Sequence, residues 1–127
     1  MTDCIVDTCI FIDISRNKTE AINWLQKKSN MSIGISGFTL FEMLEGARNK
    51  TEMETIKSEF KNIPIYWLNE DEFNESIEIY SKMKLTFGVD VIDTIIAMTA
   101  IKFNIPLITL NKKHFSNFKD LQIIIPY

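Results

Sequence analysis

The chain has 127 residues, a length typical of one domain, so we expect a single domain over residues 1–127. With 46% hydrophobic and 24% charged residues, and only 4 Gly and 3 Pro, the composition excludes a disordered or low-complexity chain. The net charge of −3 excludes nucleic-acid binding by bulk positive charge alone. The sequence shows no leader and no apolar run of about 18 residues, so we expect a cytoplasmic protein with no membrane segment.

The first half of the chain alternates short apolar runs with amphipathic helices. The first run ends at Asp7, which is typical of a buried strand that stops at a polar residue. In chain order, we expect a strand over residues 4–6, a helical turn over 11–14, a helix over 19–28, a strand over 31–36, and helices over 39–47 and 51–61.

The second half continues the alternation and contains the most apolar helix. In chain order, we expect a strand over 65–68, helices over 70–84 and 92–103, a strand over 106–110, a loop or short helix over 111–118, and a strand over 121–125. Gly88 stops the first of these helices, and Asp90 or a neighbour caps the second. One face of the 70–84 helix carries an apolar stripe that we expect to lie in the core, formed by Phe73, Ile77, Tyr80 and Met83.

This order of elements predicts an α/β fold. Strands alternate with helices, and no Asn-Gly or Asp-Gly hairpin dipeptide occurs, which favours a mainly parallel central sheet of about five strands. Right-handed crossovers between parallel strands place helices on both faces of such a sheet.

Polar side chains follow several of the expected strands, where the working site of a parallel sheet lies. Asp7 follows the first strand, Ser36 the second, and residues 109–111 the fourth, while Glu42 and Asp93 lie near the starts of helices that leave the same edge. Carboxylates brought together raise each other's pKa unless a cation neutralises them, and oxygen ligands suit hard cations. The acids therefore indicate a site for Mg²⁺ or Mn²⁺.

Each acid also has an ordinary structural interpretation. Asp7 can end a strand and accept a hydrogen bond from the following turn. Thr39-x-x-Glu42 has the form of a capping box, and Asp90-x-x-Asp93 that of a capping pair at a helix start. The hypothesis of a metal site depends on the joint placement of the acids.

Four segments of the chain resemble the motifs of the PIN domain family, in the family's order and nearly end to end. These segments are VDTCIFID at 6–13, TLFEMLEGA at 39–47, DTIIAMTA at 93–100 and PLITLNKKHF at 106–115. PIN domains of this length are mostly VapC-type toxins of toxin–antitoxin pairs. The resemblance implies a PIN-like three-layer fold and a metal-dependent endoribonuclease, with Asp7, Glu42 and Asp93 as ligands of Mg²⁺ or Mn²⁺. It also implies a homodimer and a VapB-type antitoxin that blocks the site.

Further polar residues around these motifs are candidates for accessory roles. Asn111 would orient a water or a ligating carboxylate as part of the catalytic set. Thr8 and Thr109 offer hydroxyls for contacts with a phosphate or for supporting contacts to the metal ligands. Lys112 and Lys113 would contact RNA phosphates. Ordinary strand-end threonines and a solvated lysine loop are the alternatives.

The sequence departs from the family pattern at two positions. Cys9 stands where the family has Asn or Ser, so we expect a polar orienting group to be missing there, and Cys4 and Cys9 to be small buried apolar groups. His114 stands where an acid often follows, either as a substitute for that acid or as a surface histidine without a role. Asp90 is a further accessory candidate, and the number of metal ions stays open.

Other functions compete with this interpretation. A catalytically weak or silent PIN-like module that binds RNA or protein is the stronger alternative, although the chain keeps three acids. A haloacid-dehalogenase-type phosphotransfer enzyme needs a second Asp at the position of Cys9. A flavodoxin-type ligand domain needs a phosphate loop where the chain has the apolar residues 8–11.

Overall fold

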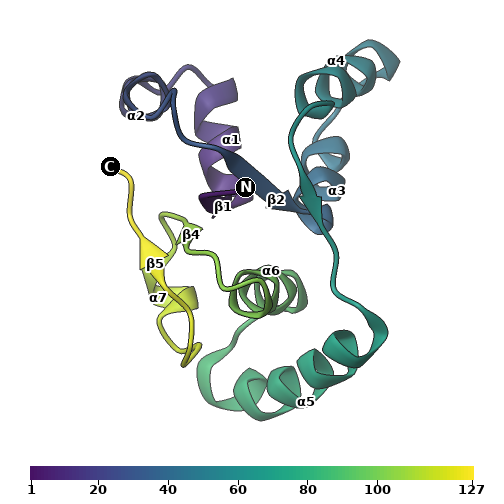
Figure 1. The fold of residues 1–127 in the computed structure, drawn as a ribbon. Coiled ribbons are helices and arrows are strands. Elements are labelled where there is room, and N and C mark those ends of the chain that lie inside the picture. Colours follow the sequence, from purple (N-terminus) through teal and green to yellow (C-terminus); the bar gives the residue numbers. More distant parts are fainter.

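A computed structural model describes residues 1–127 as a five-stranded parallel sheet combined with seven helices (Figure 1). The strands are β1 (Cys4–Val6), β2 (Ile33–Ser36), β3 (Ile65–Tyr66), β4 (Leu107–Ile108) and β5 (Ile123–Ile124), in the order β3-β2-β1-β4-β5. The helices are α1 (Thr8–Ser15), α2 (Thr19–Lys27), α3 (Gly37–Glu45), α4 (Lys50–Phe60), α5 (Glu70–Phe87), α6 (Val91–Lys102) and α7 (Lys112–Phe115). The parallel α/β fold expected from the sequence is confirmed.

The central strand β1 is buried on both of its faces because successive side chains alternate across a sheet. Ile5 packs in one core cluster with Ile96 of α6 and Phe115 of α7. Cys4 and Val6 point the other way into a second cluster, which includes Trp24 of α2 and Ile10 of α1. Helices therefore cover both faces, and the three layers are visible in Figure 1.

The expected strands are longer than the observed ones. The four strands β2 to β5 are shorter than the expected strands over 31–36, 65–68, 106–110 and 121–125. The reason is that only the residues of β2 to β5 pair with a neighbouring strand. The helical turn expected over 11–14 is the longer α1, because Asp7 caps it directly after β1. Likewise, α5 continues past residue 84 to Phe87 and ends at Gly88, whose φ of 67° is left-handed.

The apolar stripe of α5 lies only partly in the core: Tyr80 and Met83 pack against one core cluster, as expected, whereas Ile77 does not. Ile77 is 62% exposed, and Phe73, Tyr80 and Met83 are only partly buried. The reason is that α5 packs against α6 rather than on the sheet, and it lies at the outside of the molecule, at the bottom of Figure 1. Nothing covers its outer side in this chain.

None of the helices has the length and apolar character that a membrane crossing requires.

Candidate active site

Asp7 occupies the carboxyl end of the central strand and begins the first helix. Its Oδ1 accepts a hydrogen bond of 2.8 Å from the backbone N–H of Thr8, which makes Asp7 the N-cap of α1. Asp7 therefore does end a strand and accept a hydrogen bond from the following turn, as its ordinary structural interpretation expects. The residue is 4% exposed, and its second oxygen, Oδ2, faces groups from other parts of the chain.

Two side-chain donors meet Asp7 Oδ2. Thr109, which follows β4 beside β1, donates its hydroxyl over 2.7 Å, and the thiol of Cys9 donates over 3.4 Å. Thr109 Oγ1 also accepts the backbone N–H of Asn111 at 3.0 Å. The supporting contact expected for Thr109 is thus present, whereas the polar group expected to be missing at position 9 is supplied by a thiol. The only feature of the sequence that indicates this role of Cys9 is its position two residues after Asp7.

Glu42 reaches the same edge from α3. Its Oε1 accepts the hydroxyl of Thr8 over 2.6 Å, so Thr8 links the first helix to the third. Burial raises the pKa of Glu42 above its ordinary value, the hydrogen bond from Thr8 opposes this shift, and the negative charges of Asp7 and Asp90 add to it. With Glu45, the carboxylate therefore lies within the electrostatic field of three other acids.

The capping box Thr39-x-x-Glu42 is wrong. Helix α3 begins at Gly37 immediately after β2, and Ser36 is its N-cap, with Oγ 3.2 Å from the N–H of Phe38. Thr39 is already inside the helix, and its hydroxyl is fully buried without a hydrogen-bond partner. Glu42 is thus free of any capping duty.

Asp93 and Asp90 divide two roles between them. Asp90 is the N-cap of α6, and its Oδ1 accepts the N–H of Asp93 over 2.7 Å, which confirms Asp90 as a capping residue. The carboxylate of Asp93 instead contacts the ring of His114. Burial and the charges of Asp90 and Asp7 raise the pKa of Asp93 to about 6, and a contact with His114 opposes the shift.

His114 is not an isolated surface histidine. Its Nδ1 lies 3.2 Å from Oδ2 of Asp93, while the ring remains 59% exposed. Helix α7, which follows β4, brings this residue to the start of α6. The other residues of the fourth motif, Asn111, Lys112 and Lys113, are exposed, and their side chains form no hydrogen bond or ion pair.

The chain contains no group of three or more His, Cys, Asp and Glu side chains that could hold a metal ion as they stand. The donor set is still that of a site for a hard cation. Asp7 raises the pKa of both Glu42 and Asp93, so the three carboxylates share one electrostatic environment, and all of their ligand atoms are oxygens. The residues therefore fit Mg²⁺ or Mn²⁺ in chemistry.

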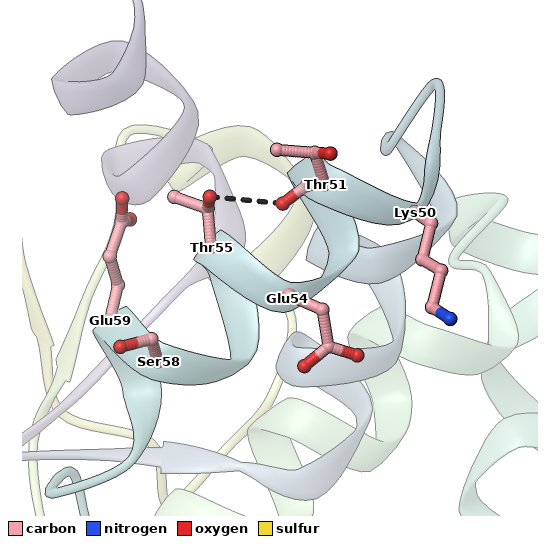
Figure 2. Close-up of a pocket in the computed structure, with 6 residues that line it drawn as sticks. All are labelled: Lys50, Thr51, Glu54, Thr55, Ser58 and Glu59. Carbon is pink, nitrogen blue, oxygen red and sulfur yellow. Dashed lines mark hydrogen bonds between the residues drawn. The ribbon is translucent and has the colours of Figure 1, made fainter.

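A separate surface hollow of about 550 Å³ runs along α4, and none of these acids lines it (Figure 2). All six residues that line it are polar and belong to this one helix: Lys50, Thr51, Glu54, Thr55, Ser58 and Glu59. The hydroxyl of Thr55 is satisfied by the carbonyl of Thr51 at 3.0 Å. A hollow formed by one solvated helix flank offers no converging groups, so the carboxyl edge of the sheet is the better candidate.

Comparisons with known proteins identify relatives of the whole chain. The model of the PIN domain family matches residues 4–121. The chain is similar to a ribonuclease VapC of Rickettsia bellii, at 33% identity over 94% of this chain and 93% of that protein. Its fold is similar to a toxin–antitoxin complex from Klebsiella pneumoniae (TM-score 0.77, 24% identity, 98% of each chain). It is also similar to VapBC2 from Rickettsia felis bound to a promoter DNA fragment (TM-score 0.76, 22% identity, 94% of this chain and 96% of that chain).

Proposed function

The chain belongs to the PIN domain family, and we propose that it is a metal-dependent endoribonuclease, the toxin of a toxin–antitoxin pair, with residues 1–127 as one PIN domain. The observation that carries the proposal is the shared environment of Asp7, Glu42 and Asp93, which come from three distant segments and interact through their charges. The ribonuclease name of a relative that aligns over most of both chains supports the reaction.

Asp7, Glu42 and Asp93 would hold Mg²⁺ or Mn²⁺. When bound, the cation lowers the pKa of a water and neutralises charge that develops on the phosphate. Two threonine hydroxyls orient these carboxylates before a cation binds. Thr109 donates a hydrogen bond to Asp7, and Thr8 donates one to Glu42. The acidic chain thus relies on the cation for the positive charge that its composition does not provide.

The fourth motif would handle the substrate. Lys112 and Lys113 are exposed on α7, which also carries His114, and are suited to hold RNA phosphates. Asn111 would orient a water or a ligating carboxylate through its side-chain amide. His114 would present its exposed ring to the RNA while its Nδ1 contacts Asp93.

Partners follow from the relatives rather than from the chain itself. Structures with this fold include toxin–antitoxin complexes, so we propose a VapB-type antitoxin that covers the acids, and a homodimer as the working assembly. Expression of the chain alone should arrest growth, and co-expression of a neighbouring small antitoxin should restore it. Undiminished growth with the chain alone contradicts the toxin role.

The test of the reaction is cleavage of RNA by the purified protein with Mg²⁺ or Mn²⁺, and loss of cleavage with EDTA. Asp7→Asn should reduce the rate at least about a hundredfold, because it removes a ligand charge. Asp71→Asn is the matched control, since Asp71 is exposed on α5 and should retain full activity. Intact RNA in every sample, together with RNA or antitoxin binding, would instead favour the silent binding module.

A further inference from the structure

Cys9 lies where the first motif meets the end of β4. Its sulfur is 3.4 Å from Asp7 Oδ2 and 3.7 Å from Thr109 Oγ1, although Cys9 and Thr109 are 100 residues apart. Asp7 itself is almost completely buried. The thiol therefore touches both the candidate metal ligand and the residue that orients it.

The hydrogen bonds around Asp7 leave a defined place for this thiol. Thr109 has one hydroxyl proton, which goes to Asp7 Oδ2, and its oxygen accepts the Asn111 N–H. Oδ1 of Asp7 is engaged by the Thr8 N–H. The thiol is the remaining donor close to Oδ2, and a sulfur donor suits the longer distance of 3.4 Å.

Cys4 provides an internal comparison. It is also buried, in β1, but its neighbours Val6, Ile10 and Trp24 are apolar, and its sulfur has no hydrogen-bond partner among the side chains described above. Cys4 therefore matches the expectation of a small apolar group, whereas Cys9 does not. The two thiols of the chain differ in their surroundings, because only the thiol of Cys9 donates a hydrogen bond to a carboxylate.

We propose that Cys9 is a positioning residue for Asp7: its thiol and the hydroxyl of Thr109 together hold Oδ2 in the orientation in which Asp7 binds the divalent cation. The effect on the cation rests on the proposed function, whereas the hydrogen bond itself does not. A carboxylate fixed by three donors loses less conformational freedom when it binds a metal ion than one that rotates.

The hydrogen bond can be tested without metal, RNA or activity. Cys4→Ala leaves Cys9 as the only thiol, so the infrared S–H stretching band then reports on this residue alone. The band should lie at lower frequency in Cys4→Ala than in Cys4→Ala/Asp7→Ala, where the acceptor is removed. Circular dichroism checks that both variants are folded. An equal frequency in the two variants overturns the hydrogen bond and the proposal with it.

The positioning role is tested by Mn²⁺ affinity, measured by electron paramagnetic resonance. Cys9→Ala should bind Mn²⁺ about tenfold more weakly than the wild type, and Cys9→Ser, which restores a donor, should stay within about threefold. Cys4→Ala is the control for losing a buried thiol and should bind Mn²⁺ as the wild type does. Unchanged affinity in Cys9→Ala, or equal weakening in Cys9→Ser, contradicts the role.

The two measurements separate this inference from the proposed function. If the wild type binds no Mn²⁺, the metal-dependent function fails and the positioning role fails with it, and the infrared bands then show whether the contact exists as a structural one. If Mn²⁺ binds and only Cys9→Ala weakens it, both stand. If Mn²⁺ binds equally to all Cys9 variants, only the proposed function survives.

Discussion

The acids of the candidate site lie in different local environments. Asp7 receives hydrogen bonds from a backbone N–H, a hydroxyl and a thiol. Glu42 and Asp93 are instead partly buried and face other negative charges, which favour their protonated forms. Such repulsion lowers the stability of the fold, and it is a cost that functional sites commonly carry.

We predict that Asp93→Asn stabilises the protein in EDTA near pH 7.5. The pKa of Asp93 is raised to about 6 in the fold, above the value of about 3.9 in an unfolded chain, so ionisation destabilises the wild type as pH rises from about 4 through about 6. The gain should be on the order of 1 kcal/mol, allowing for solvent screening, and should vanish below about pH 4. Urea unfolding at several pH values measures it, and a gain that does not change with pH contradicts the explanation.

We also predict that Thr39→Val stabilises the protein by about 1 kcal/mol. The Thr39 hydroxyl is fully buried without a partner, and valine has nearly the same shape. Thr99→Val is the matched control, because the equally buried Thr99 donates to the Ile95 carbonyl over 2.7 Å and should gain nothing. Urea unfolding of both variants decides the prediction, and equal changes would sink it.

At the scale of elements, the junction between β2 and α3 sets the position of Glu42. The strand ends at Ser36, which caps the helix, and α3 begins at the next residue without a loop. The indole of Trp67, just after β3, packs directly on Gly37, where a β-carbon would overlap the ring. Trp67 in turn contacts Phe38 and Phe41 of α3 edge to face, at ring-centroid distances of 6.1 and 6.5 Å. The start of α3 is thus held against the sheet.

Gly37→Ala should therefore destabilise the protein by about 1 to 3 kcal/mol, the range for an overpacked site. It should also weaken RNA cleavage, because α3 carries Glu42. Gly46→Ala is the control, since Gly46 has φ of −78° and a β-carbon there meets only Met43 O, at 3.5 Å. This variant should be neutral or slightly stabilising. Thermal unfolding and an RNA cleavage assay report both effects, and similar behaviour of the two variants would contradict the packing argument.

At the scale of the whole molecule, the parallel sheet joins distant parts of the chain at one edge. Residues 7, 42, 93 and 114 come from the cap of α1 and from α3, α6 and α7. The charge of Asp7 acts on both Glu42 and Asp93, and Asp93 contacts His114. A ligand bound by these residues would connect helices from both layers. Cation binding should then stabilise the entire fold rather than one segment.

Mn²⁺ should accordingly raise the midpoint of thermal unfolding. Mass action gives a stabilisation of about 2.7 kcal/mol at a cation concentration 100 times Kd. Asp7→Asn should lose most of this gain, whereas Asp71→Asn should keep it, at constant ionic strength set with NaCl. Equal stabilisation of the wild type and Asp7→Asn would show that the cation binds elsewhere.

The sequence by itself determined the features that depend on local patterns. The alternation of elements gave the parallel α/β fold, the helical spacing gave α5 and α6 to within a few residues, and the four motifs indicated the family. These succeed because hydrophobic period and end signals are properties of neighbouring residues. Asp7 is likewise identified as a polar group after an apolar strand, and Glu42 and Asp93 as acids near the starts of helices.

Only the tertiary structure decided which groups meet and which faces are covered. Whether Ile77 is buried depends on α6 and on what lies outside α5, and the capping role of Ser36 rather than Thr39 depends on where β2 stops pairing with β1 and β3. The contacts of Cys9 with Thr109 and of His114 with Asp93 join residues 100 and 21 positions apart. Such contacts have no local signature, because they arise from the register of parallel strands rather than from the spacing of residues along the chain.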